Sequence, residues 1–74
     1  MITVLFFGRI ADIAGVRRLE VAMPEQGLAL LALRDQVLGG VADVRMSLNR
    51  DVVREDRALA DGDEVAFFSV FSGG

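Results

Sequence analysis

The sequence predicts an α+β domain in which a mixed sheet curls over one main helix. The chain has 74 residues, which suits a single domain with one core. Its most apolar strand-like runs lie near its two ends, at residues 2–7 and 64–71. Between them, residues 28–38 carry apolar side chains at helical spacing. Short strands arranged around one helix are typical of α+β architectures.

The N-terminal third predicts a strand, a short helix and a second strand. Residues 2–7 are β-branched, aliphatic and aromatic, which favours a strand, and Gly8 ends it. Residues 9–14 have apolar side chains at helical spacing for one or two turns, and Gly15 is suited to close that helix. Residues 18–22 alternate polar and apolar side chains, which indicates a half-exposed strand.

The main helix is predicted over residues 28–38. Leu30, Leu33 and Val37 share one face of it, with Leu31 and Leu38 beside them. The helix ends before Gly39-Gly40.

The remainder of the chain predicts further strands joined by turns. Residues 45–49 alternate again, and Asn49-Arg50-Asp51 is a turn that leads into Val52-Val53. Residues 54–60 are expected to form an irregular, charged surface segment. Asp61-Gly62-Asp63 predicts a tight turn, with Gly62 free to adopt positive φ. The last and most hydrophobic strand then runs from Glu64 to about Phe71.

Alternation along the two strongest strands predicts which side chains face the helix. Ile2, Val4 and Phe6 share one face of the first strand, and Val65 and Phe67 share one face of the last strand. Thr3 and Glu64 lie on the opposite faces of these strands. Because both are polar, they indicate the outer face, which points away from the helix. An outward apolar side chain indicates partner binding, unless it packs under a loop or a bulge shifts the register. We therefore expect a partner-binding surface, here called the docking face, made of Phe7, Phe68 and Val52.

The composition excludes several kinds of chemistry. Cysteine and histidine are absent, so the chain has no thiol nucleophile, no disulfide and no imidazole base or metal ligand. The net charge is −3 and the eight basic residues, all arginine, are scattered, so we expect no nucleic-acid partner. The longest uncharged run, residues 65–74, is too short to span a membrane, and the N-terminus has no basic leader. We expect a cytoplasmic protein with no membrane contact.

The chain ends in Gly73-Gly74, which is the candidate reactive site. Glycine has no Cβ and tolerates most backbone conformations, so such a tail is able to thread a narrow channel. A terminal carboxylate is a poor electrophile, and a partner must first convert it to a mixed anhydride such as an acyl-adenylate. The alternative is that this diglycine is only a frayed chain end.

Four segments carry a resemblance to a known family. They are Ile2-Thr3-Val4-Leu5-Phe6-Phe7-Gly8, Ser47-Leu48-Asn49, Asp61-Gly62-Asp63-Glu64-Val65-Ala66-Phe67-Phe68 and the final Gly73-Gly74. Together they resemble the small subunit of molybdopterin synthase (the MoaD family), and the match runs end to end. The acidic turn, the double phenylalanine and the diglycine, at their family spacing, are its most specific part.

This resemblance implies a ubiquitin-like β-grasp fold over residues 1–74, with a flexible tail at about residues 72–74. It implies that Gly74, preceded by Gly73 in the tail, is adenylated by a ubiquitin-activator-like enzyme that uses ATP, and is then converted to a thiocarboxylate. The chain itself would bind no cofactor or metal and would not be an enzyme on its own. It would donate sulfur to precursor Z inside the large synthase subunit, in a heterotetramer of two small and two large subunits. The docking face would contact both partners.

One segment departs from the family pattern, because Ser69-Val70-Phe71 stands where members usually have Pro-Pro. Serine and valine are able to continue a strand, whereas proline donates no hydrogen bond to a ladder. Three alternatives therefore stay open: a carrier for thiamine thiazole or another sulfur metabolite, a ubiquitin-like protein modifier, and an interaction module with an incidental diglycine. A cation site at Asp61, Asp63 and Glu64 is a weaker alternative, because such acidic turns are usually only solvated.

Overall fold

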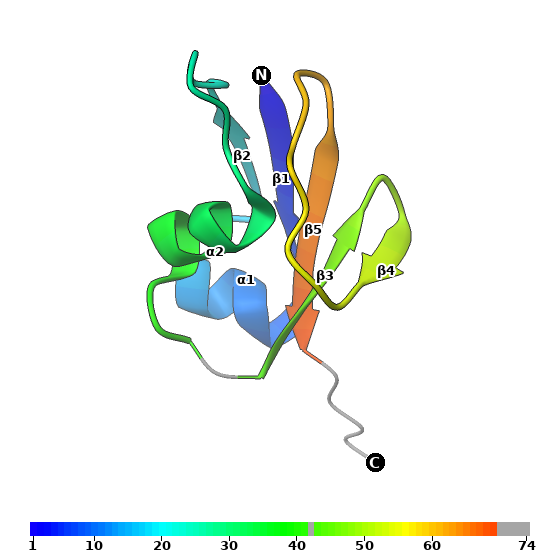
Figure 1. Cartoon of the computed structure of the whole chain (residues 1–74). Helices are drawn as coiled ribbons and strands as arrows, with labels where there is room; N and C mark the ends of the chain where they lie inside the picture. Colours follow the sequence, from blue (N-terminus) through cyan, green and yellow to red (C-terminus); the bar gives the residue numbers. More distant parts are fainter. Residues whose placement is uncertain (42, 70–74) are drawn as a thin grey trace.

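The computed structural model describes residues 1–41 and 43–69, which form five strands and two helices (Figure 1). In chain order these elements are β1 (Ile2–Phe6), α1 (Gly8–Ala14), β2 (Arg18–Val21), α2 (Leu30–Leu38), β3 (Val44–Leu48), β4 (Asp51–Val53) and β5 (Glu64–Ser69). The predicted α+β class is confirmed. The expected tail at about 72–74, and residues 70–71 of the predicted last strand, lie outside the described residues.

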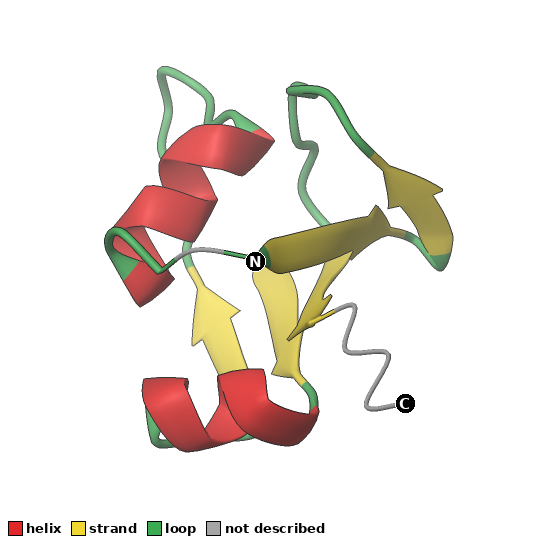
Figure 2. Cartoon of the chain, turned by 90° about the horizontal axis from the view of Figure 1, so that it is seen from below, coloured by secondary structure: helices red, strands yellow, loops and turns green. Residues whose placement is uncertain are grey.

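The strands form one mixed sheet in the order β2-β1-β5-β3-β4. β1 and β5 are parallel, with Val4 opposite Val65, and the other neighbouring strands are antiparallel. Seen from the tail end in Figure 2, the sheet curls with α2 on its concave side, while α1 lies across the end where β1 and β5 finish. The two strands from opposite ends of the chain thus pair at the centre of the sheet.

The predicted strand faces are confirmed by burial. The rings of Phe6 and Phe67 stack in the core with centroids 5.9 Å apart. From α2, Leu30, Leu33 and Leu38 are buried, whereas Val37 is only half-buried. Burying an aliphatic or aromatic side chain of this size stabilises a fold by about 1.5–3 kcal/mol. The side chains that are almost completely buried are Ile2, Val4, Ile10, Leu30, Leu33, Val65 and Phe67.

Two tight turns shape the end of the sheet opposite the tail, and both were predicted. Gly62 has φ 92°, the left-handed conformation that glycine adopts without strain. In the hairpin between β3 and β4, Asn49 has φ 51° and Arg50 has φ 74°. Positive φ at both central residues is the pattern of a type I′ hairpin, whose twist matches that of the flanking strands.

The start of α2 was predicted two residues too early, because the preceding segment pairs with a distant loop. The backbone N–H of Leu30 donates to the carbonyl of Arg57 at 2.8 Å, and the N–H of Leu59 donates to the carbonyl of Leu28 at 2.9 Å. Leu59 is buried, so residues 54–60 are not purely a surface segment as expected. In the described part of the chain, neither helix has the length and apolar character needed to cross a membrane.

Candidate partner-binding site

The central strand β5 ends at Ser69, the last residue that the structure describes (Figure 1). Ser69, the last residue of β5, lies opposite Val44 of β3. On the other side, the N–H of Phe7 donates to the carbonyl of Phe67 at 3.0 Å. β5 is thus paired with β3 up to Ser69 and with the β1 side as far as Phe67. Gly73 and Gly74 lie outside the described residues, and their chemical roles stay predictions.

Two residues of the docking face lie side by side near this exit. Phe7 directly follows β1 and is 52% exposed. Phe68 faces away from α2 and is half-buried. The parallel register that places Phe6 opposite Phe67 brings the next two residues, Phe7 and Phe68, together. The structure therefore presents an outward aromatic pair at the root of the tail.

The third residue of the docking face, Val52, lies farther away on the edge strand β4. It is 61% exposed and lies opposite Ser47 of β3, which in turn lies opposite Ala66 of β5. Val52 is thus two strands from β5, and it is offset along the sheet from Phe68. Partner binding by these three residues stays a prediction, with Val52 at the periphery.

Between these residues lies a row of side chains that the sequence reasoning did not select. Across the outer face, Leu5 lies opposite Ala66 and Ala66 opposite Ser47. Ala66 is 8% exposed and Ser47 is 9% exposed, although both face away from α2. Their side chains are small and larger neighbours flank them. The alternation that places Thr3 and Glu64 on the outer face also places this row there. Ala66 and Ser47 are small, however, so the sequence did not indicate an apolar surface at this position.

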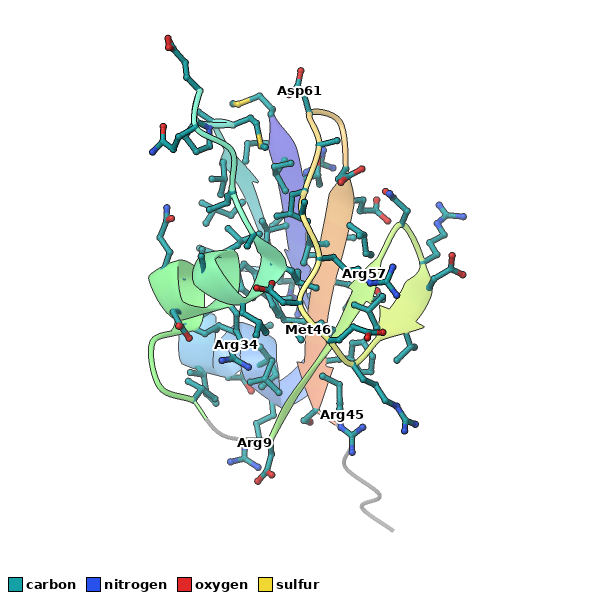
Figure 3. All side chains as sticks on the ribbon, in the orientation of Figure 1. Arg9, Arg34, Arg45, Met46, Arg57 and Asp61 are labelled. Carbon is teal, nitrogen blue, oxygen red and sulfur yellow. The ribbon has the colours of Figure 1, made fainter. Side chains whose placement is uncertain are left out.

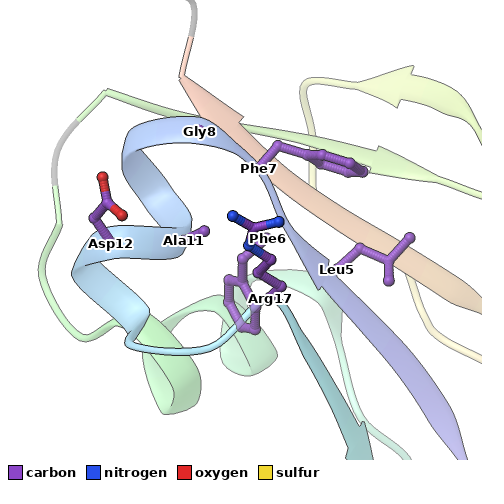
Figure 4. A pocket seen from close by; sticks show the side chains of 7 residues that line it. All are labelled: Leu5, Phe6, Phe7, Gly8, Ala11, Asp12 and Arg17. Carbon is purple, nitrogen blue, oxygen red and sulfur yellow. The ribbon is translucent and has the colours of Figure 1, made fainter.

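A depression of about 550 Å³ lies beside Phe7 (Figure 4). Leu5 and Phe7 form its sheet side, and Ala11 and Asp12 of α1 form the opposite side. Arg17 also lines it and supplies a positive group next to the apolar wall. An apolar anchor in a pocket with a polar border is the usual form of a protein–protein hot spot. The depression therefore adjoins Phe7 of the docking face at the end of β1.

The acidic turn has a structural role of its own at the other end of the sheet. One oxygen of the Asp63 carboxylate accepts the side-chain amide of Asn49 at 3.0 Å, and the other accepts the N–H of Ala60 at 2.8 Å. The Asn49 amide oxygen accepts the N–H of Glu64 at 2.9 Å. Asp61 pairs with the N-terminal ammonium group. Within residues 1–41 and 43–69, no cluster of three or more acidic residues is arranged to hold a metal ion.

The fold is a ubiquitin-like β-grasp, and solved structures share it over nearly the whole chain. SAMP1 from Haloferax volcanii superposes with a TM-score of 0.79 at 22% identity, covering 99% of this chain and 98% of that one. A second structure, of H. volcanii small archaeal modifier protein 1, gives a TM-score of 0.74 at 19% identity, over 92% and 94% of the two chains. At these identities the likeness establishes the fold alone.

The sequence comparison is more specific than the structural one. The model of the ThiS family matches residues 4–74. The chain is also 35% identical over 81 aligned residues to the molybdopterin synthase sulfur carrier subunit of Escherichia coli (strain K12), with all of both chains covered. The chain belongs to the ThiS family, and the resemblance to the molybdopterin synthase small subunit is confirmed.

Proposed function

We propose that this chain is the sulfur carrier subunit of a molybdopterin synthase, which donates sulfur and is not a catalyst on its own. The observation that carries the proposal is the 35% identity to the E. coli carrier subunit over the whole of both chains, together with the Gly73-Gly74 ending. The absence of cysteine and histidine supports it, since no other group of the chain is suited to covalent chemistry.

The proposed chemistry takes place at the Gly74 carboxylate. On an adenylating partner, a carboxylate oxygen attacks the α-phosphorus of ATP, pyrophosphate leaves, and an acyl-adenylate forms. Hydrosulfide supplied by a sulfurtransferase system then attacks the acyl carbon, the bond from that carbon to the AMP oxygen breaks, AMP leaves, and loss of a proton gives a thiocarboxylate. The large synthase subunit transfers this sulfur to precursor Z, and water returns the Gly74 acyl group to a carboxylate. In this cycle, which we place in the cytoplasm, the partner consumes ATP and the chain itself binds no cofactor.

The docking face is proposed to bind both partners in turn. Phe7 and Phe68 lie at the root of the tail, so a partner that covers them also receives the tail. Because the chain has one tail, the adenylating enzyme and the large subunit compete for it. In the synthase, each of two large subunits would hold one copy of this chain, which gives a heterotetramer.

Intact-mass measurement of the protein purified from its native host tests this proposal. We expect a fraction of the chains to show the mass increase of one oxygen-to-sulfur exchange, located at Gly74 by fragmentation. Deleting Gly74 should abolish sulfur transfer in a reconstituted synthase, while thermal unfolding and binding to the large subunit stay close to those of the full chain. Full activity of the truncated chain would contradict the proposal.

Intact-mass measurement and the reconstituted synthase together separate the alternatives. A protein modifier would instead appear in higher-mass conjugates joined through Gly74. A carrier for thiamine thiazole or another sulfur metabolite would show the thiocarboxylate but would not activate the large synthase subunit. The genes next to the gene of this chain provide an independent test of the pathway. A neighbouring gene for a large synthase subunit would favour molybdopterin synthesis.

A further inference from the structure

The eight arginines divide into two groups according to their ion pairs. Arg18, Arg34, Arg50 and Arg57 each lie within 4.0 Å of a carboxylate oxygen. The other four have neither an ion pair nor a side-chain hydrogen bond within the described part of the chain. These four, here called the arginine rim, are Arg9, Arg17, Arg45 and Arg54.

The topology gathers the arginine rim at the end of the sheet where the tail begins. Arg9 is the second residue of α1, directly after β1, and Arg17 directly precedes β2, which runs antiparallel to β1. Arg45 lies opposite Phe68 near the end of β5, and Arg54 follows the last residue of β4. Figure 3 shows Arg9 and Arg45 at this end, and Figure 4 shows Arg17 beside Phe7.

The carboxylates are distributed differently from the arginine rim. At the tail end, Asp12 of α1 and Asp43, which precedes β3, make no ion pair with the rim, and Asp35 pairs with Arg34. The opposite end of the sheet holds the acidic turn and Glu20, which lies opposite Thr3. Glu55 and Asp56 directly follow Arg54, but Glu55 pairs with Arg57 and Asp56 accepts the backbone N–H groups of Leu31 and Arg57. The end of the sheet where β5 finishes thus holds both signs of charge, and within the described residues its four rim arginines are not paired with any of these carboxylates.

We propose that the arginine rim docks on an acidic surface that surrounds the channel through which the adenylating partner admits the tail. This inference rests on the proposed function, in which the tail enters a partner. Guanidinium groups bind carboxylates through paired hydrogen bonds, and arginine is enriched in protein interfaces. The rim is continuous with the docking face, because Arg45 lies opposite Phe68 and Arg17 lines the depression beside Phe7.

The charge distribution also orients the chain as it approaches its partner. An acidic surface attracts the arginine rim and repels the acidic turn at the opposite end, so the chain arrives tail first. Electrostatic steering of this kind raises association rates by about 10- to 1,000-fold and weakens as salt is added. A carrier that must be loaded again after each transfer benefits from fast association.

Two double variants with the same change in charge test the proposal. Arg45→Glu with Arg54→Glu reverses two rim charges, and Arg50→Glu with Arg57→Glu reverses two charges outside the rim. Association rate constants with the adenylating enzyme from the same genome are measured across a salt series. We expect the rim variant to associate at least about 10-fold more slowly at low salt and to lose most of its salt dependence. The control variant should change less than about threefold.

Equal slowing of the two variants would overturn the proposal, because net charge alone would then explain the effect. Faster association of the rim variant would overturn it as well, since the partner surface would then be basic. Binding of duplex DNA through the same arginines, at the salt concentration where the enzyme does not bind, would assign the rim to nucleic acid. Thermal unfolding of each variant checks that the fold is intact.

Failure of the proposed function would look different. If the unaltered chain binds no adenylating enzyme and acquires no sulfur, the carrier assignment fails, and the rim proposal fails with it. If the unaltered chain binds and acquires sulfur while both variants behave alike, only the rim proposal fails. Deleting Gly73 and Gly74 should leave the salt dependence of association in place, because the rim is unchanged.

Discussion

The two ends of the sheet use charged and polar side chains in opposite ways. At the acidic turn, side-chain hydrogen bonds of Asp63 and Asn49 join the β3–β4 hairpin to the turn at residues 60–64, and the N-terminal ammonium group pairs with Asp61. At the tail end, the arginine rim has no such partners within the described residues, and Phe7 is exposed beside it. One end satisfies its polar groups internally, whereas the other leaves charge and apolar surface available.

This difference separates stability from recognition within one small domain. The hydrogen bonds of the acidic turn join the start of β5 to the β3–β4 hairpin, so they fix the strand whose far end carries the tail. A residue at the acidic end should therefore affect unfolding more than binding. A residue at the tail end should affect binding more than unfolding.

The largest expected effect is at the aromatic pair. Replacing Phe68 by Asp should weaken binding to the large synthase subunit by about 2 kcal/mol or more, because an interfacial aromatic side chain is replaced by a charge. Ile13→Asp is the matched control, since Ile13 is an exposed apolar residue on α1, outside the docking face. Isothermal titration calorimetry measures both affinities. Equal affinity of Phe68→Asp and the unaltered chain would mean that the docking face is wrongly placed.

The next effect is on stability and lies at the acidic end. Asp63→Ala should lower the free energy of unfolding by about 1.5 kcal/mol, because it removes hydrogen bonds to Asn49 and to the N–H of Ala60. Asp61→Ala, which removes one exposed ion pair, should cost no more than about 0.5–1 kcal/mol. Urea unfolding compares the two variants. A larger loss for Asp61→Ala would contradict the assigned role of Asp63.

The smallest effect is a gain in stability at the β3–β4 turn. Arg50 has φ 74°, a conformation that glycine adopts without strain, and its side chain contributes only an exposed ion pair to Glu64. Arg50→Gly should therefore raise the free energy of unfolding by about 0.5 kcal/mol. Arg57→Gly is the control, because Arg57 has no positive φ and glycine there should destabilise. Thermal unfolding that shows losses of equal size would contradict this account.

Much of the fold could be predicted from local sequence patterns. The alternation along residues 2–6 and at Val65 and Phe67 identified the buried face, since side chains of a strand point to its two faces in turn. Gly62 and the Asn49-Arg50 pair identified tight turns, because few residues tolerate positive φ. The diglycine identified the candidate reactive end without any structural information.

The remaining features depend on contacts between residues far apart in the sequence. The start of α2 is set by hydrogen bonds to residues 57–59, which no helical period reveals. The basic residues looked scattered because Arg9, Arg17, Arg45 and Arg54 are separated along the chain. They lie at one end of the sheet because β1 and β4 end there and β2 and β3 begin there. The row of Leu5, Ala66 and Ser47 likewise required the register between strands.

The central pairing of β1 with β5 also determines when the domain is able to fold. β1 is synthesised before any other strand, but its parallel partner β5 is translated only after more than fifty further residues. Until then the apolar segment Ile2–Phe6 lacks half of its ladder and is exposed to the solvent and to other nascent chains. Pairing across such a sequence separation slows folding and favours aggregation of incomplete chains. The central pair of strands is therefore able to form only after residues 7–63, which separate β1 from β5, have been translated.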